Sequence, residues 1–256
     1  MSSQPSPTDT GKASENEQRT KAEQVRDMFG AIAGRYDLLN NILSFGIDGM
    51  WRRELVALAK KDKPAVILDV ATGTADLAIA LKKALPEASV VGVDFAPEML
   101  EHGRSKVAKK NLDVTLEQGD GQNLAFDDNS FDLVTIAYGI RNFSDRQRGL
   151  DEFYRVLKPG GRLMVLEFPP PPKGLFGRLF RLYFLGITPY IAGFVAGRKE
   201  AYAYLGESVL NFYEPDVFAA MLQRSGFDKV RYKLQTFGVS ALHVAEKQTP
   251  NNTHSL

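Results

Sequence analysis

Hydrophobic and polar positions follow two different periods along the chain, and the change of period predicts where its elements lie. Between Lys21 and about Ala59, apolar residues recur at three- and four-residue spacing, which indicates helix. From Val66 onward, short apolar runs alternate with helix-spaced segments. The predicted strands cover 66–71, 89–93, 113–117, 131–137 and 161–168, and the helices between them cover 75–84, 97–109 and 146–157. This alternation predicts a parallel sheet with helices on both faces.

The last part of the chain has a different pattern. The segment "VRYKLQTFGVSALHVAEK" (230–247) contains two strand-like runs around a tight turn near Thr236 to Gly238, which is typical of a hairpin. The "KPGG" segment at 158–161 is expected to end the helix before it. We therefore expect an α/β fold whose mostly parallel sheet ends in an antiparallel hairpin.

The composition along the chain predicts one domain with two tails. Residues 1–20 are rich in Ser, Thr, Pro, Gln and charge, so we expect them to be disordered. A single domain should cover 21–247, with a helical cap at 21–60 and a substrate-binding or lid insertion at 169–215. Residues 248–256 are expected to form a flexible tail.

Charge and residue usage exclude several classes of function. The net charge is +1 with no long basic tail, which argues against a nucleic-acid partner. The chain has no cysteine, and its three histidines are scattered, so we expect no metal site. His243 lies between two apolar residues of a predicted strand and is expected to be structural. No segment has the pattern of a signal peptide or a membrane span, so a cytoplasmic location is the expectation.

Candidate binding residues follow three consecutive predicted strands. In "LDVATGTADLA" (68–78), Gly73 allows a sharp turn before a helix whose free N–H groups favour an anion. Asp94 ends the second strand, where a carboxylate can accept hydrogen bonds from both ribose hydroxyls. Asp120 follows the third strand and could accept from an adenine amine, with Gly121 leaving room for the ring. This series predicts a site for a nucleoside with a compact charged tail.

Two other interpretations of these residues are considered. An aspartate at a strand end is often only a helix cap. A dinucleotide-dependent oxidoreductase would need the G-x-G-x-x-G fingerprint, of which only Gly73 is present.

Several longer segments carry a family resemblance. They are "FGAIAGRYDLLNNILSFGIDGMWRR" (29–53), "LDVATGTADLA" (68–78), "YGIRNFSD" (138–145), "RVLKPGGRLMVLEF" (155–168) and "YAYLGESV" (202–209). On them, the chain resembles the Rossmann-like class I S-adenosylmethionine (SAM)-dependent methyltransferases. More narrowly, it is similar to the demethylmenaquinone/ubiquinone C-methyltransferase family. That family's fold is a seven-stranded, mostly parallel sheet ending in an antiparallel hairpin, with helices on both faces.

The resemblance implies a cofactor and its binding residues. SAM would be the methyl donor, without a metal. Gly73 and Thr74 would contact its methionine part, Asp94 the ribose, and Asp120 and Gly121 the adenine. Two departures from the family pattern affect this site. Ala137 stands where some members have a small polar residue, so only a backbone contact is expected there. Ala75 replaces a common glycine, so its methyl group is expected to press on the cofactor.

The resemblance also implies the reaction, the methylation of a ring carbon of a polyprenylated hydroquinone. Arg141 is the candidate cation for the phenolate and Tyr36 the hydrogen-bonding partner of a ring oxygen, with Asn142 and Asp37 holding them. The alternatives are a structural ion pair for Arg141 and a packing role for Tyr36.

The acceptor itself is less sharply defined. Demethylmenaquinol is the main expectation, and a methoxy-benzoquinol of the ubiquinone pathway, or both, is the alternative. Another phenol or sterol acceptor and a non-catalytic subunit of a quinone-synthesis complex are the rival functions. A homodimer is left open.

One basic, aromatic-rich segment is the candidate for handling a lipid tail. It is "KGLFGRLFRLYFLGITPYIAGFVAGRK" (173–199), whose charged residues are all positive. We expect contact with an anionic membrane surface, or else a buried lid or a dimer contact. Arg178 and Arg181 should share one face, with Leu179 and Leu182 turned elsewhere.

Overall fold

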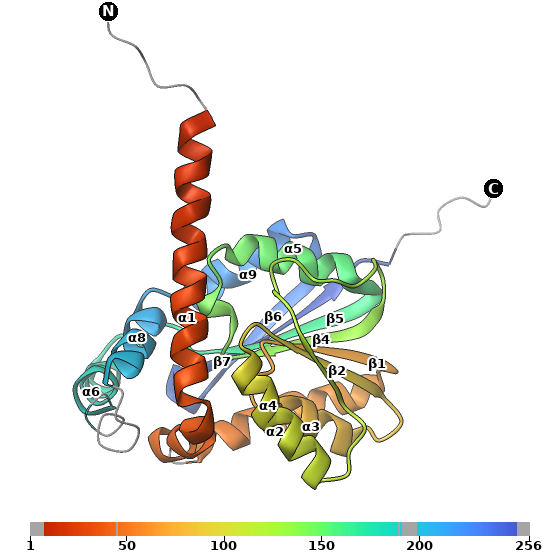
Figure 1. The fold of residues 1–256 in the computed structure, drawn as a ribbon, viewed down its shortest axis with the longest axis horizontal. Helices are drawn as coiled ribbons and strands as arrows, with labels where there is room; N and C mark the ends of the chain where they lie inside the picture. The colour runs from red at the N-terminus through yellow and green to blue at the C-terminus, as the bar shows by residue number, and fades with distance from the viewer. Residues whose placement is uncertain (1–7, 45, 189, 191–198, 250–256) are drawn as a thin grey trace, which may run out of the picture.

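The centre of the protein is a seven-stranded sheet. The structure is a computed structural model that describes residues 8–249 except 45, 189 and 191–198. The strand order is β3-β2-β1-β4-β5-β7-β6, with parallel pairing from β3 to β5 and β7 antiparallel to both of its neighbours (Figure 1). The strands are β1 (Val66–Val70), β2 (Ser89–Asp94), β3 (Thr115–Gln118), β4 (Phe131–Ala137), β5 (Leu157–Glu167), β6 (Phe227–Gln235) and β7 (Ser240–Lys247). The predicted parallel sheet with a closing hairpin is confirmed.

Helices cover both faces of the sheet, as predicted. They are α1 (Thr8–Leu43), α2 (Ile47–Asp62), α3 (Asp76–Ala84), α4 (Pro97–Lys109), α5 (Arg146–Val156), α6 (Leu175–Arg181), α8 (Lys199–Leu210) and α9 (Pro215–Arg224), with short turns η1 (Ile140–Asn142), η2 (Leu182–Ile187) and η3 (Thr236–Gly238). Successive strand residues enter opposite cores: Ile67 packs in the core with α2, α3 and α4, and Leu68 in the core with α5 and α9 (Figure 1).

The first helix is longer than the sequence pattern predicts. Helix α1 begins at Thr8, so the expectation of a disordered segment 1–20 is corrected for residues 8–20, and residues 1–7 lie outside the described part. The physical reason is composition, because Lys, Ala, Glu and Gln in this stretch are strong helix formers although it has no apolar face. In Figure 1 this half of α1 extends away from the sheet.

The "KPGG" segment follows the end of a helix, as expected, but it belongs to a strand. Helix α5 ends at Val156 and β5 starts at the next residue, so the segment forms the irregular beginning of β5. The pairing with β4 shifts register between Phe131 and Leu133, and Gly160 has a φ of 78°. The glycines therefore allow a bulge in the strand.

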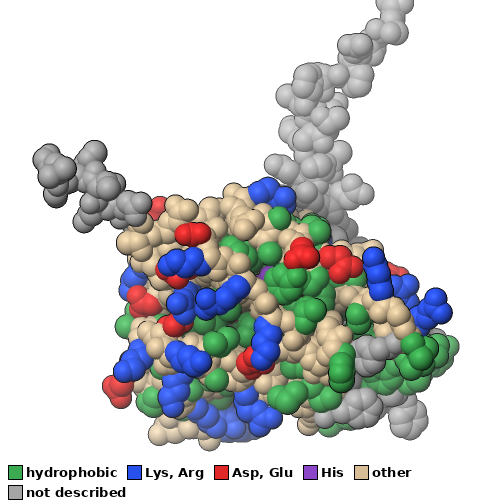
Figure 2. Space-filling view, turned by 180° about the vertical axis from the view of Figure 1, so that it is seen from behind, with side chains coloured by type: hydrophobic (Ala, Val, Ile, Leu, Met, Phe, Trp, Pro, Cys, Tyr) green, Lys and Arg blue, Asp and Glu red, His purple; other side chains and the backbone are tan. Residues whose placement is uncertain are grey.

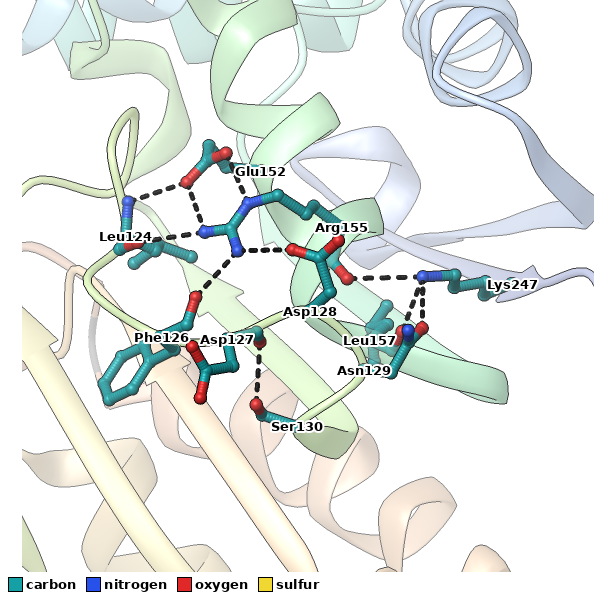
Figure 3. A network of polar contacts seen from close by, with 10 residues as sticks. All are labelled: Leu124, Phe126, Asp127, Asp128, Asn129, Ser130, Glu152, Arg155, Leu157 and Lys247. Atoms are coloured by element: carbon teal, nitrogen blue, oxygen red, sulfur yellow. Dashed lines mark hydrogen bonds and ion pairs between the residues drawn. The ribbon is translucent and has the colours of Figure 1, made fainter.

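A polar network fixes the loop that leads into β4, at the end of that strand away from its carboxyl end (Figure 3). Arg155 donates to the carbonyl oxygens of Leu124 and Phe126, at 2.9 and 2.7 Å, and pairs with Glu152 and Asp128. These carboxylates raise the pKa of the guanidinium, Glu152 contributing most. Lys247 of β7 donates to the carbonyl oxygens of residues 155 and 157. The chain end is thereby tied to the loop on which β4 starts.

His243 has a structural position on β7, as expected. Its exposed fraction is 2%, and Nε2 lies 3.1 Å from the carbonyl oxygen of Pro215. A carbonyl only accepts, so Nε2 carries a proton. Burial lowers the pKa of the imidazole to about 4.

No helix in the described ranges combines the length and apolar character that crossing a bilayer requires.

Candidate active site

The sheet topology places a cavity at the carboxyl ends of the strands. The order reverses between β1 and β4, where the connections leave in opposite directions and ligands bind in open α/β sheets. This strand-end cavity is lined by residues that follow β1, β2, β3 and β4, and by one side of α1. Five of the predicted cofactor residues meet here: Gly73, Asp94, Asp120, Gly121 and Ala137.

The turn after β1 shapes one wall of the strand-end cavity. Ala71, Gly73 and Ala75 have φ of 51°, 56° and 65°, whereas the threonines between them do not have positive φ. Alternation of this kind turns successive N–H groups toward one side, where they can hold an anion. Ala75 is fully buried and its methyl lies toward Gly103 of α4, so the expectation that it presses on the cofactor is corrected.

Asp94 organises this wall. Its Oδ2 accepts a 2.7 Å hydrogen bond from the Gly73 N–H, and its Oδ1 accepts a 2.9 Å bond from the Ala96 N–H. Burial raises the pKa of the carboxyl. Each oxygen keeps a second lone pair, which fits an acceptor of ribose hydroxyls.

The residues after β3 serve packing as well as the cavity. Asp120 accepts a 2.9 Å bond from the Gln122 N–H and lines the cavity. A Cβ on Gly121 would lie 2.5 Å from the Phe143 ring and 2.7 Å from a Val70 methyl. The room that Gly121 provides is therefore filled by Phe143, which itself faces the strand-end cavity.

The structure places Thr74 and Asp37 differently from the expectation. Thr74 is buried and does not line the strand-end cavity; its hydroxyl donates to Asp37 at 2.6 Å and accepts from Lys106 at 3.0 Å. Asp37 also pairs with Lys106 at 2.7 Å, and Lys106 contacts Asp76. Asp37 thus ties α1 to the turn after β1, and it does not hold Tyr36 by a hydrogen bond to it.

Asp69 supports the same turn from within the sheet. Its carboxylate accepts from the hydroxyls of Thr72 and Thr135, at 2.7 and 2.6 Å. Burial raises its pKa to about 6, against the lowering effect of these hydrogen bonds.

Asp69 and His243 should give opposite pH dependences of stability. The folded pKa of Asp69 is raised, so its contribution to the free energy of unfolding falls as the pH rises from about 4 to 6. The folded pKa of His243 is lowered, so its contribution grows from about pH 4 to 6.5. We compare the free energy of unfolding at pH 7 with that at pH 4.5. His243→Gln should make the difference, pH 7 minus pH 4.5, about 2 kcal/mol smaller, and Asp69→Asn should make it about 2 kcal/mol larger. Urea unfolding at both pH values measures this, and changes of the same sign would contradict it.

A second, apolar cavity adjoins the first. It has a volume of about 250 Å³, and Phe29, Tyr36, Tyr138 and Asn142 line both cavities. Its other walls are mainly aromatic and aliphatic side chains from α1, α2, the end of β5, α6 and η2. We call it the acceptor cavity, because a molecule in it would lie beside the strand-end cavity, where the sequence predicts the methyl donor.

Arg141 lies in the wall of the acceptor cavity, in a buried ion pair. Its Nη1 donates to Glu167 Oε1 at 2.7 Å and to the Tyr138 carbonyl, and both side chains of the ion pair are at most 2% exposed. This is the structural pairing considered as the alternative. Its buried Nε–H has no partner within the described part of the chain. The described residues therefore leave at least this donor of Arg141 unused.

Tyr36 lies on the wall shared by the two cavities. It is half-buried, and its ring makes an edge contact with Phe29 at 6.0 Å between centroids. Burial raises the pKa of its phenol, and the charge of Arg141 opposes this.

Sequence reasoning missed polar residues of the acceptor cavity. The cavity is also lined by Ser44, Asp48 and Arg52. Their four-residue spacing around the start of a helix could have indicated that they share one face. Tyr138 was also missed; it has a φ of 58° and stacks on Phe168 at 4.5 Å. Within the described ranges, no three acidic or histidine side chains are grouped to hold a metal ion.

Solved structures share this fold. A SAM-dependent methyltransferase from Aquifex aeolicus matches with a TM-score of 0.53 and 20% identity, covering 71% of this chain and 81% of its own. A SAM-dependent methyltransferase from Thermotoga maritima matches with a TM-score of 0.58 and 17% identity, covering 88% and 100%. This chain therefore has the fold of these SAM-dependent methyltransferases, with a glycine turn after β1 and an acidic residue at the end of β2.

Sequence comparison gives the family within this class. Residues 16–247 match the ubiE/COQ5 methyltransferase family. The demethylmenaquinone methyltransferase of Thermus thermophilus is 53% identical, covering 86% of this chain and 100% of its own, and that of Deinococcus radiodurans is 49% identical, covering 91% and 96%. The ubiquinone/menaquinone biosynthesis C-methyltransferase of Geobacter sp. strain M21 is 46% identical, covering 89% and 97%. The chain belongs to the ubiE/COQ5 methyltransferase family and is a SAM-dependent methyltransferase.

Proposed function

We propose that this protein methylates a ring carbon of demethylmenaquinol and so forms menaquinol. The observation that carries the proposal is the wall shared by the strand-end and acceptor cavities, which suits a flat apolar acceptor next to a methyl donor. The relatives from Thermus thermophilus and Deinococcus radiodurans carry the same activity in their names and match over nearly their full length.

The residues of the strand-end cavity fit SAM. The turn at Gly73 offers N–H groups to the methionine carboxylate, and Asp94 offers two acceptor oxygens to the ribose hydroxyls. Asp120 and Gly121 border the adenine position, where Phe143 provides a ring surface. Ala137 offers SAM only its backbone, and Thr74 acts indirectly, by fixing the turn after β1. When bound, SAM supplies an electrophilic methyl group on a sulfonium.

Tyr36, Arg141 and Asn142 are the candidates for activating the acceptor. A hydroquinol carbon becomes nucleophilic as a ring hydroxyl loses its proton, and an ordinary phenol has a pKa near 10. The free Nε–H of Arg141 and the Tyr36 hydroxyl can donate to that oxygen and stabilise its developing charge. The apolar walls exclude water, which strengthens these hydrogen bonds.

A labelled-methyl assay tests the function. The protein is incubated with methyl-deuterated SAM and two reduced acceptors, short-tail demethylmenaquinol and a demethylated methoxy-benzoquinol. We expect label on the naphthoquinol. Label on the benzoquinol as well would support the second candidate, which the name of the Geobacter relative favours. Label on neither, with SAM binding intact, would overturn both.

We also propose that the α6 region meets a membrane surface, from which the prenyl tail enters the acceptor cavity. Phe180, Tyr183 and Phe184 line the cavity from inside. Leu175, Leu179 and Leu182 are 74%, 58% and 64% exposed, at the four- and three-residue spacing of one helix face. Leu179 and Leu182 are thus exposed, as Lys173, Arg178 and Arg181 also are.

This exposed surface combines leucines with basic side chains, as an interfacial helix does. Figure 2 shows hydrophobic and basic side chains together at the end of the molecule that carries α6. Phe237 of η3 is 84% exposed, and Gly238 beside it lies next to Pro172, which leads toward α6. Residues 191–198 of the predicted 173–199 segment lie outside the described part.

Vesicle flotation tests the membrane contact. Arg178→Glu with Arg181→Glu should reduce binding to anionic vesicles by at least about thirtyfold, because each of the two basic residues near the surface contributes about 1 kcal/mol. Lys229→Glu, an exposed change on β6 away from this surface, is the matched control. Equal binding of the double variant, the control and the unchanged protein would contradict the proposal.

A further inference from the structure

The acceptor cavity has a second polar cluster that the proposed roles of Tyr36, Arg141 and Asn142 leave unused. It consists of Ser44, Asp48 and Arg52, where α1 ends and α2 begins. Asp48 is the only acidic residue among the described residues that line this cavity. A carboxylate in a mainly apolar wall is costly to bury unless hydrogen-bond donors contact it.

The contacts within the cluster fix the carboxylate of Asp48 as an acceptor. Ser44 Oγ donates to its Oδ1 at 2.7 Å, and Arg52 Nη2 donates to its Oδ2. Arg52 Nη1 lies 3.7 Å from Asp76, so two carboxylates share this guanidinium. The side chain of Asp48 retains 11% exposure, and each of its oxygens has a second lone pair. A ligand that approaches Asp48 therefore meets a carboxylate oxygen that accepts hydrogen bonds.

This difference separates the two oxidation states of the acceptor. A hydroquinol presents O–H groups that can donate to a carboxylate, whereas the quinone presents carbonyl oxygens that only accept. If a quinone carbonyl lies against Asp48, the carbonyl oxygen and the carboxylate oxygen are both acceptors, and no hydrogen bond forms between them. A 1,4-hydroquinol has two hydroxyls on opposite sides of its ring, one for the Tyr36 and Arg141 side and one for Asp48.

We propose that Asp48, held by Ser44 and Arg52, binds a ring hydroxyl of the acceptor and makes the site selective for the reduced hydroquinol over the quinone. This inference rests on the proposed function, because it places the quinone-type acceptor in this cavity. It assigns Asp48 to substrate selection and does not assign it a proton-transfer step.

Trp51 provides a direct probe of the cavity. It is the single tryptophan of the chain, it lines the acceptor cavity, and its Nε1 donates to Thr236 Oγ1 at 2.8 Å. Quenching of its fluorescence therefore reports binding without any methyl transfer. The ligands are a short-tail 2-prenyl-1,4-naphthohydroquinol, kept reduced under anaerobic conditions, and the corresponding naphthoquinone. Both are titrated at saturating S-adenosylhomocysteine, so that the strand-end cavity is filled and no turnover occurs.

We expect the unchanged protein to bind the hydroquinol at least about tenfold more tightly than the quinone, the range for a hydrogen bond to a charged group. Asp48→Asn should bring the two affinities within about threefold, because an amide can donate to a carbonyl. Glu54→Gln is the matched control, since it makes the same chemical change on α2 outside the cavity and should keep the ratio. If Asp48→Asn does not fold, Asp48→Asn with Arg52→Gln removes the whole ion pair and carries the same expectation.

The outcomes separate this inference from the proposed function. If neither ligand quenches Trp51 in the unchanged protein, the acceptor cavity is wrong and the proposed function fails with it. If both ligands bind with equal affinity, or if Asp48→Asn keeps the preference for the hydroquinol, the role of Asp48 is wrong while the proposed function stands.

Discussion

Glu167→Gln should lower the free energy of unfolding by about 3 kcal/mol, one of the two largest effects that we expect from a single substitution. Glu167 is 1% exposed and receives hydrogen bonds from the side chain and backbone of Arg141 and from the Phe168 N–H. The glutamine can still accept, but it leaves the charge of Arg141 buried without an opposite charge. Urea unfolding at pH 7 measures the loss.

A double variant distinguishes the pairing of Arg141 from its proposed role in the reaction. Arg141→Met with Glu167→Gln removes both charges, and the amide oxygen of the glutamine can keep one of the two backbone N–H groups paired, so part of the stability should return. Methyl transfer by this double variant should remain at least about tenfold reduced, because the donor to the ring oxygen is gone. A double variant as unstable as Glu167→Gln would contradict the first expectation, and full activity would exclude Arg141 from the reaction.

Asp94→Asn should weaken the binding of S-adenosylhomocysteine by about a hundredfold. The substitution removes a charged acceptor of hydroxyl donors, and each such hydrogen bond contributes about 1.5–3 kcal/mol. It also disturbs the hydrogen bonds from the Gly73 and Ala96 N–H groups, which shape this side of the strand-end cavity. Isothermal titration calorimetry measures the change.

The matched comparison for Asp94 is Asp120→Asn. Asp120 follows the neighbouring strand and lines the same cavity, but its Oδ1 already accepts from the backbone and side chain of Gln122. We expect about a tenfold loss of affinity there. An effect at Asp120 equal to or larger than that at Asp94 would argue against the ribose role of Asp94.

The sequence predicted those parts of the fold and site that depend on local order. Alternating apolar runs and helical segments gave the sheet, because each element carries its own periodicity. Gly73, Asp94 and Asp120 meet because the carboxyl ends of neighbouring parallel strands share one edge. The topology, and not the separation in sequence, brings them together.

Contacts between distant elements could not be predicted in the same way. The partner of Arg141 is Glu167, at the end of a strand that reads as apolar, and their pairing requires β4 and β5 to be neighbours. Ser44, Asp48 and Arg52 read as the polar side of a helix, and only the packing of α1, α2 and η2 makes that side face a cavity. The turn at Ala75 was misjudged because the direction of its methyl depends on a φ of 65°.

Helix α1 contributes residues to both cavities, and Asp37 fastens it to the turn that carries Gly73. A donor in the strand-end cavity and an acceptor in the acceptor cavity would therefore contact the same helix, and we expect their binding to be coupled through α1. If each ligand orders this helix, each raises the affinity for the other, and by thermodynamic reciprocity it does so by the same factor.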